Sequence, residues 1–249
     1  MGLFQKLIGF YFVLGCGAFI LALISIFKGK NYPTLEKGVL YIFIAGFIAH
    51  SFGLALRWYI SGHAPWSDSY ESMVYIGWSA GFAGVMVFRK SILSLAAAAI
   101  LAAIVMLVAH MSFVNPQITN LVPVLKSYWL TVHVSVITAS YGFLGMGALL
   151  GFITLLLMIL KNKKNALRMN EQIRHLVAIN EISLIIGLSM LTIGNFFGGI
   201  WANESWGRYW GWDPKETWAY ISIIVYTIIL HVRLIPKWYS LYLFALLSV

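Results

Sequence analysis

Charged side chains are scarce in this chain. Of its 249 residues, 10% are Asp, Glu, Lys or Arg, while 61% are hydrophobic. Soluble domains usually carry about 25% charged residues. So few charges cannot cover the surface of a soluble globule of this length. The composition therefore excludes that class and predicts a membrane protein.

Cysteine is almost absent. Cys16 is the single one, and it lies inside an apolar run. A lone cysteine excludes an intrachain disulfide, a Cys-x-x-Cys redox pair and a Cys-x-x-Cys-His site for covalent haem attachment. The chain is therefore not itself a c-type cytochrome. It also lacks proline-rich or low-complexity linkers, which favours a single membrane domain over residues 1–249.

Long apolar runs are what the chain has instead. Seven runs carry no charge and reach or approach the roughly 20 residues that a membrane helix needs. They are 7–27, 38–56, 72–88, 92–113, 127–160, 182–203 and 217–232. An eighth run follows Lys237 and stops at Val249. The pattern predicts an all-α polytopic membrane helix bundle with seven full spans and a partial eighth, and hence a chain truncated at its C-terminus.

The distribution of positive charge predicts the topology. The net charge is +9, and twelve of the 17 basic residues lie in alternate loops. Cytoplasmic loops of membrane proteins are enriched in Lys and Arg, so the excess needs no nucleic acid to explain it. This rule places the N-terminus and the loops around 58–71, 114–127 and 201–216 outside. It also predicts a basic cytoplasmic loop over 161–178.

Tryptophan is concentrated in one external loop. Five of the ten tryptophans fall within eighteen residues: Trp201, Trp206, Trp210, Trp212 and Trp218. Flat indole faces suit a flat apolar ligand such as haem, and Gly207 and Gly211 permit turns that gather them. The alternative is an aromatic belt at the membrane surface. Asp213, Pro214 and Glu216 also have the spacing of a helix N-cap with a capping box.

Six histidines are candidate ligands for haem iron. His133 lies at the outer end of the fifth run, level with the tryptophan loop, and is the first candidate. His231 lies near the cytoplasmic end of the seventh run and suggests a second site, the alternative being a hydrogen bond to a neighbouring helix. His63 belongs to an aromatic outer loop that could line a ligand edge. The sequence assigns no role to His50 or His110.

Three cations on the outer face, Arg57, Lys126 and Arg208, could pair with the two haem propionates. Contact with lipid phosphate is the alternative for each of them.

The tryptophan-rich loop resembles that of the haem-handling proteins of cytochrome c assembly. The similarity is to the CcsA (ResC) branch of the System II cytochrome c synthase, known for its WWD motif. It is carried by Trp206, Gly207, Arg208, Tyr209, Trp210, Gly211, Trp212, Asp213, Pro214, Lys215, Glu216, Thr217 and Trp218, with His231 and Arg233. The Asp-Pro-Lys-Glu-Thr-Trp continuation differs from the related CcmC haem-export branch. The resemblance extends to His133, to 140–142 and to the loop from Arg57 to Glu71.

The resemblance implies a haem-presenting subunit that moves haem b across the membrane for covalent attachment to apocytochrome c. In that picture His133 ligates haem iron at the external loop. The other cofactor-binding residues would be Arg57, His63, Trp206, Gly207, Arg208, Trp210, Trp212 and Asp213. His231 would ligate haem within the membrane, opposite a ligand from a CcsB/ResB-like subunit. No residue of the chain itself would be catalytic.

The resemblance also implies a cellular location and an incomplete C-terminus. The membrane would be the bacterial cytoplasmic membrane, with a thylakoid membrane as the alternative. The family has a further external histidine after the span that follows His231, and this sequence ends before one. We therefore expect the chain to be a fragment.

Two other functions fit a histidine-containing membrane bundle. A b-type electron-transfer cytochrome would pair histidines at matching depths on neighbouring helices. A secondary transporter would use intramembrane histidines as proton relays and would show inverted repeats. The chain shows no convincing internal repeat.

Overall fold

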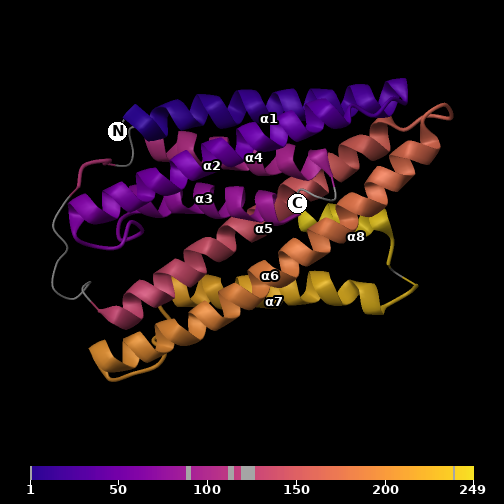
Figure 1. The fold of residues 1–249 in the computed structure, drawn as a ribbon. Helices are drawn as coiled ribbons and strands as arrows, with labels where there is room; N and C mark the ends of the chain where they lie inside the picture. The colour runs from indigo at the N-terminus through magenta and orange to yellow at the C-terminus, as the bar shows by residue number, and fades with distance from the viewer. Residues whose placement is uncertain (1, 88–90, 112–114, 119–126, 238) are drawn as a thin grey trace.

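The computed structural model describes residues 2–87, 91–111, 115–118, 127–237 and 239–249 (Figure 1). Within these ranges the regular structure is helical and contains no strand. The helices are α1 (Gly2–Lys28), α2 (Pro33–Ser61), α3 (Ser69–Val87), α4 (Ile92–His110), α5 (Tyr128–Leu160), α6 (Ala166–Trp206), α7 (Pro214–His231), the 3-10 helix η3 (Val232–Leu234) and α8 (Leu241–Ser248). The prediction of an all-α bundle is confirmed.

Six helices of the described chain are long and apolar enough to cross a membrane. They are α1, α2, α4, α5, α6 and the stretch Pro214–Leu234 that joins α7 to η3. The run predicted as the third span does form a helix, α3, of 19 residues, but α3 is not one of these six. The prediction of a membrane protein therefore holds, while the count of seven full spans is not confirmed.

The prediction of a basic loop over 161–178 is wrong from residue 166 onward. There α6 begins, and it continues for 41 residues to Trp206. Its first turns bury Met169, Ile173, Leu176 and Val177, which share one face of a helix. This apolar stripe packs the segment onto the bundle although its other face is charged. At 1.5 Å per residue α6 is about 60 Å long, so it extends well beyond a hydrocarbon layer of about 30 Å.

Small side chains set the closest helix contacts. On α4 the run from Ala96 to Ala99 is buried, and α4 packs against both α1 and α3. Along α5, Gly147 faces Leu184 of α6 and Gly151 faces the carbonyl oxygen of Ala245 in α8. Small residues let helix backbones approach closely in membranes, where association depends on packing.

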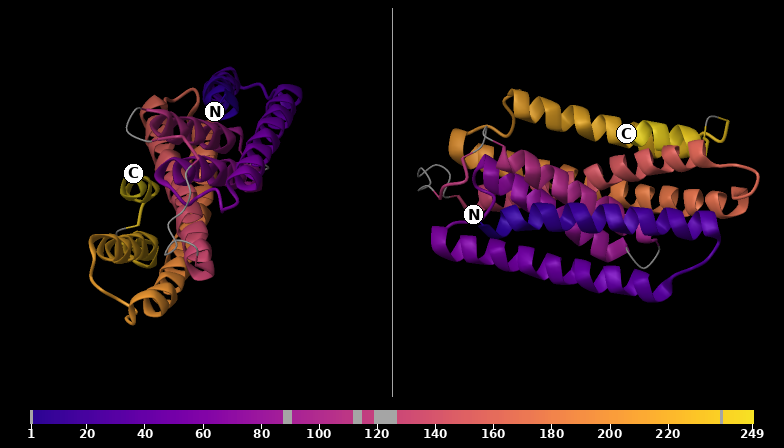
Figure 2. Two further views of the ribbon diagram at one scale, coloured as in Figure 1. Left: turned by 90° about the vertical axis from the view of Figure 1, so that its left-hand side faces the viewer. Right: turned by 90° about the horizontal axis from the view of Figure 1, so that it is seen from above.

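The α5–α6 pair lies in the middle of the bundle. Figure 2 shows α7 and α8 on one side of this pair and α1 and α2 on the other. The turns at 62–68 and 207–213 lie at one end of the bundle with the start of α5, and the basic turn at 161–165 lies at the other end (Figure 1). This arrangement matches the predicted alternation of the loops.

Candidate functional site

A pocket of about 540 Å³ lies between α5, the C-terminal half of α6, the loop 207–213 and the start of α7. Its volume falls in the range of small-molecule and cofactor sites. Four residues predicted from sequence line it: His133, Trp206, Trp210 and Asp213. Trp201 and Trp218 line it as well, so the pocket is largely aromatic. The fold thus joins the first-choice histidine to the tryptophan-rich loop.

His133 is oriented by a backbone contact from the neighbouring helix. It lies in the second turn of α5 and is half-buried. Its Nδ1 lies 2.7 Å from the carbonyl oxygen of Gly194 in α6. A carbonyl oxygen only accepts hydrogen bonds, so Nδ1 carries the proton and Nε2 keeps its lone pair. A metal-ligating histidine is usually oriented in this way by its second nitrogen.

Gly198 leaves room for the His133 ring. A Cβ at position 198 would lie 2.5 Å from Cε1 and 2.7 Å from Nδ1 of His133. We therefore expect Gly198→Ala to displace the imidazole and to lower the affinity of any ligand that His133 coordinates roughly 10- to 100-fold, as loss of ligand orientation does at metal sites. Titration of the variant with haem, followed by absorption, measures the effect.

The control for this substitution is Gly17→Ala. Gly17 lies on the exposed side of α1, and an added Cβ there meets no atom within 4 Å. The Gly17→Ala variant should bind haem as the unchanged protein does. Unaltered binding by Gly198→Ala would show that the His133 ring does not need its observed position.

The tryptophan-rich loop is a turn with two left-handed residues. Helix α6 ends at Gly207, whose φ is +70° and whose N–H donates to Asn203 O. The sequence predicted that Gly207 and Gly211 would permit the turns of this loop. The second residue with a left-handed backbone is instead Trp212, with φ +57°. A non-glycine residue in this conformation is strained, which surrounding structure must offset. Strain of this kind is concentrated at functional sites.

The indoles of the loop pack in pairs. Trp206 meets Trp201 of α6 edge to face, with ring centroids 4.6 Å apart. Trp210 meets Trp212 in the same way at 5.6 Å. Trp206 and Trp210 line the pocket, whereas Trp212 does not and is 69% exposed. The loop therefore presents part of its aromatic surface to the pocket and part to the outside.

The start of α7 has the predicted capping box. Asp213 is the N-cap residue, and its Oδ1 accepts a hydrogen bond from the N–H of Glu216 at 2.9 Å. Glu216 in turn accepts from the N–H of Asp213 and, at 2.7 Å, from the N–H of Gly211. Asp213 therefore ends the loop and also lines the pocket.

Three other predicted residues near the loop do not line the pocket. Gly207 forms the C-cap, and Trp212 points part of its surface outward. The exposed Arg208 lies over the loop backbone, because a Cβ on Gly211 would be 3.0 Å from its Cζ. Lys126 lies outside the described residues.

His231 lies far along α7 from the pocket. It is the last residue of the helix and is exposed. Its Nδ1 bonds the carbonyl oxygen of Thr227, one turn earlier in the same helix, at 2.7 Å. This contact gives His231 the same tautomer as His133. The two candidate ligands for iron therefore belong to different places in the fold.

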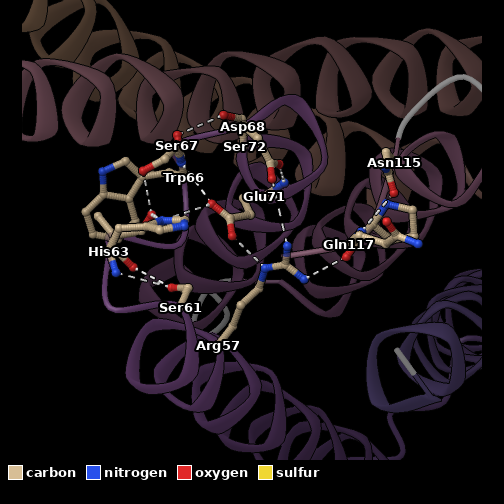
Figure 3. A network of polar contacts seen from close by, with 12 residues as sticks. Arg57, Ser61, His63, Trp66, Ser67, Asp68, Glu71, Ser72, Asn115 and Gln117 are labelled. Carbon is tan, nitrogen blue, oxygen red and sulfur yellow. Dashed lines mark hydrogen bonds and ion pairs between the residues drawn. The ribbon is translucent and has the colours of Figure 1, made fainter. Parts of the chain in front are cut away.

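Arg57 and His63 belong to a second polar cluster, drawn in Figure 3. Arg57 is buried at the end of α2, and its Nε donates to Oε1 of Glu71 at 2.7 Å. Its Nη1 donates to Pro116 O at 3.1 Å. His63 lies beside the same carboxylate, with Nδ1 3.9 Å from Glu71 Oε2. Glu71 is completely buried, so the cluster is a buried ion pair and not part of the pocket lining.

This Arg57 cluster also contacts the helix that carries His133. The indole N–H of Trp66 donates to the carbonyl oxygen of Thr131 at 3.1 Å. Thr131 precedes His133 by two residues at the start of α5. The loop after α2 therefore holds the first turn of α5 in place.

The remaining histidines have separate surroundings. His50 is fully buried in α2, with Nδ1 3.4 Å from the Tyr11 hydroxyl and its ring against Phe4. His110 is exposed at the end of α4, and His175 is exposed on α6. None of the three lines the pocket.

The pocket is also lined by residues to which the sequence assigned no role. Ile137 and Tyr141 follow His133 on α5 at spacings of four and eight, which place them on its helix face. That spacing could have identified them. Asn195, Gly198 and Lys215 also line the pocket. Contacts between helices determine their position, and no local pattern reveals it.

Comparison with known proteins places these features in a family. Residues 66–247 match the family described as cytochrome C assembly protein. The chain is 53% identical over 252 residues to Protein NrfI of Wolinella succinogenes, covering 99% of this chain and 27% of that protein. It is 37% identical over 258 residues to the cytochrome c biogenesis protein CcsA of Prochlorococcus marinus (strain SARG), covering 90% of this chain and 82% of that one.

The chain is also similar to a CcsA protein from a third organism. The CcsA protein of Chlamydomonas reinhardtii is 37% identical over 193 residues, covering 74% of this chain and 54% of that protein. The chain thus spans about a quarter of NrfI and most of the Prochlorococcus protein. The family match covers the pocket, the tryptophan-rich loop and both candidate iron ligands. The chain belongs to the cytochrome c assembly protein family, and its predicted role in cytochrome c biogenesis is confirmed at that level.

Proposed function

We propose that the protein delivers haem b across a membrane and holds it at the tryptophan-rich loop for covalent attachment to apocytochrome c. The observation that carries this proposal is the pocket itself, which is lined by His133 and by four tryptophans of the loop region. A flat apolar ring system with a central metal suits aromatic walls and a neutral imidazole. The residues present therefore fit haem as the transported substrate.

The chain's contribution to the reaction is positioning. His133 Nε2 would hold the iron, and Trp206 and Trp210, which line the pocket, would exclude water from the bound ligand. The two thiols of a Cys-x-x-Cys-His segment would then add their S–H across the two vinyl groups, which gives two thioether bonds without an oxidant. Orienting reactants in this way contributes up to about 7–11 kcal/mol in well-ordered cases. The protein would thus be the haem-presenting subunit of a cytochrome c synthase.

His231 would form a second haem site with a partner. It shares an exposed face of α7 with Ile221, Ile224 and Ile228. An imidazole facing lipid is costly, so another membrane subunit that covers this face and supplies the opposite iron ligand would stabilise it. A CcsB/ResB-like protein fits that role. The membrane would be the bacterial cytoplasmic membrane or a thylakoid membrane, with the tryptophan-rich loop on the extracytoplasmic side.

The test is haem titration of the purified protein in lipid nanodiscs, followed by absorption and tryptophan fluorescence. We expect a Soret band and strong quenching, because haem would lie beside four of the chain's ten tryptophans. A Soret band without quenching would place haem between helices, as in a b-type cytochrome. Absence of both signals would contradict the proposal and favour the transporter.

A further inference from the structure

The acidic side chains of the pocket are already engaged. Asp213 accepts from Glu216 N–H, and Glu216 accepts from the N–H groups of Gly211 and Asp213. One oxygen of each carboxylate is therefore held by the backbone of the loop and of the start of α7.

Lys215, which lies between them in sequence, is in a different situation. It lines the pocket, and the described part of the chain offers its ammonium group no ion pair or hydrogen bond. Among the described residues of the lining, it is the one with a permanent positive charge. An unpaired ammonium at the exposed edge of the pocket offers an anionic ligand a charge-assisted hydrogen bond.

Two neutral donors point to the same chemistry. The indole Nε1 atoms of Trp201 and Trp210 are buried, and neither has a hydrogen-bond partner among the described residues. Both tryptophans line the pocket, and both rings are held by neighbouring aromatic rings. Buried donors are nearly always paired in folded proteins, so these two lack an acceptor that a ligand would bring.

Two of the three predicted propionate partners do not line this pocket in the structure. Arg57 is buried in its pair with Glu71, and Arg208 lies against Gly211 outside the lining. Lys215 is thus the cation of the lining and the two indoles are its buried donors without a partner among the described residues, while His133 would supply the metal ligand.

We propose that Lys215, with the indole N–H groups of Trp201 and Trp210, recognises the carboxylates of a dicarboxylate porphyrin whose metal faces His133. This inference rests on the proposed function and adds to it the residues that select the acidic edge of the ligand. Lys215 is exposed and the two indole Nε1 atoms are buried, so an analogue without carboxylates leaves the buried N–H groups unpaired and loses the charge-assisted contact to Lys215. Sites built on polar contacts reject such analogues strongly.

The test compares iron protoporphyrin with its dimethyl ester, which keeps the ring, the vinyl groups and the iron. Both are titrated into the full chain in nanodiscs of neutral lipid, and tryptophan quenching reports binding. We expect the diacid to bind at least about 10-fold tighter than the diester, the factor typical of a hydrogen bond to a charged group. Lys215→Gln should reduce this ratio toward one, and Lys215→Arg should retain it.

Lys163→Gln is the matched control, because it makes the same substitution at an exposed lysine that does not line the pocket. Its diacid preference should equal that of the unchanged protein. Equal binding of the two porphyrins by the unchanged protein, or a full preference in Lys215→Gln, would overturn the inference and leave the proposed function intact. Failure of both porphyrins to bind would overturn the proposed function and this inference with it.

Discussion

Replacing His133 with alanine will remove haem from the pocket. The substitution deletes the imidazole whose Nε2 is left free by the Nδ1 contact to Gly194. Losing an orienting group alone costs roughly 10- to 100-fold at metal sites, so losing the ligand should cost at least roughly 100-fold in affinity. Soret absorbance together with tryptophan quenching measures this loss. Free imidazole should restore both signals, because the substitution leaves a cavity of the right shape.

The control is His110→Ala, which removes an exposed histidine at the end of α4. It should bind haem normally. In protein purified with its partner subunit, His231→Ala should lower total haem and leave the quenching that reports the pocket, because His231 lies far from it along α7. Full quenching in His133→Ala would refute its role as the ligand.

Replacing Glu71 with alanine will strongly destabilise the fold. Glu71 is completely buried, and it accepts from Arg57 Nε at 2.7 Å and from Ser67 N–H at 3.1 Å. Among the described residues, its loss leaves the buried guanidinium of Arg57 with Asp68 alone as a counter-ion, at 3.8 Å between Nη2 and Oδ2. Breaking a buried pair in this way costs about 3–5 kcal/mol. Thermal unfolding of the protein in detergent should show a Tm lowered by several degrees or more.

Two further variants separate the ion pair from general damage. Arg57→Met combined with Glu71→Met removes both charges and should recover part of the stability lost in the single variant. The exposed pair between Arg233 and Glu181 gives the comparison, since Glu181→Gln should leave the Tm nearly unchanged. A Tm in Glu71→Ala equal to that of the unchanged protein would show that Arg57 is not held in the buried pair.

Local chemistry made several features predictable. The capping box at Asp213 and Glu216 depends on a spacing of three residues, so it could be recognised in the sequence and is present. The boundaries of α4 and α5 agree closely with the apolar runs because each run is continuous. The start of α6 was missed, since the charges between Arg168 and Arg174 mask its buried face.

Other features depend on contacts between distant segments. Only the packing of α6 on α5 brings the Gly194 carbonyl and the bare surface of Gly198 to His133. Likewise, Arg57 and Lys215 are both cations, but in the fold Arg57 pairs with the carboxylate of Glu71, 14 residues later in the chain. Residue type alone could not show which of the two cations would lack an ion-pair partner.

Composition and the length of the apolar runs were enough to establish a helical membrane protein with its loops alternating between two ends, because the cost of burying charge or unpaired backbone in lipid allows few alternatives. The tertiary structure decided which side chains share a pocket. Helix rotation and close approach, which no local pattern encodes, bring His133, the tryptophan-rich loop and Lys215 together and place Arg57 and His231 elsewhere.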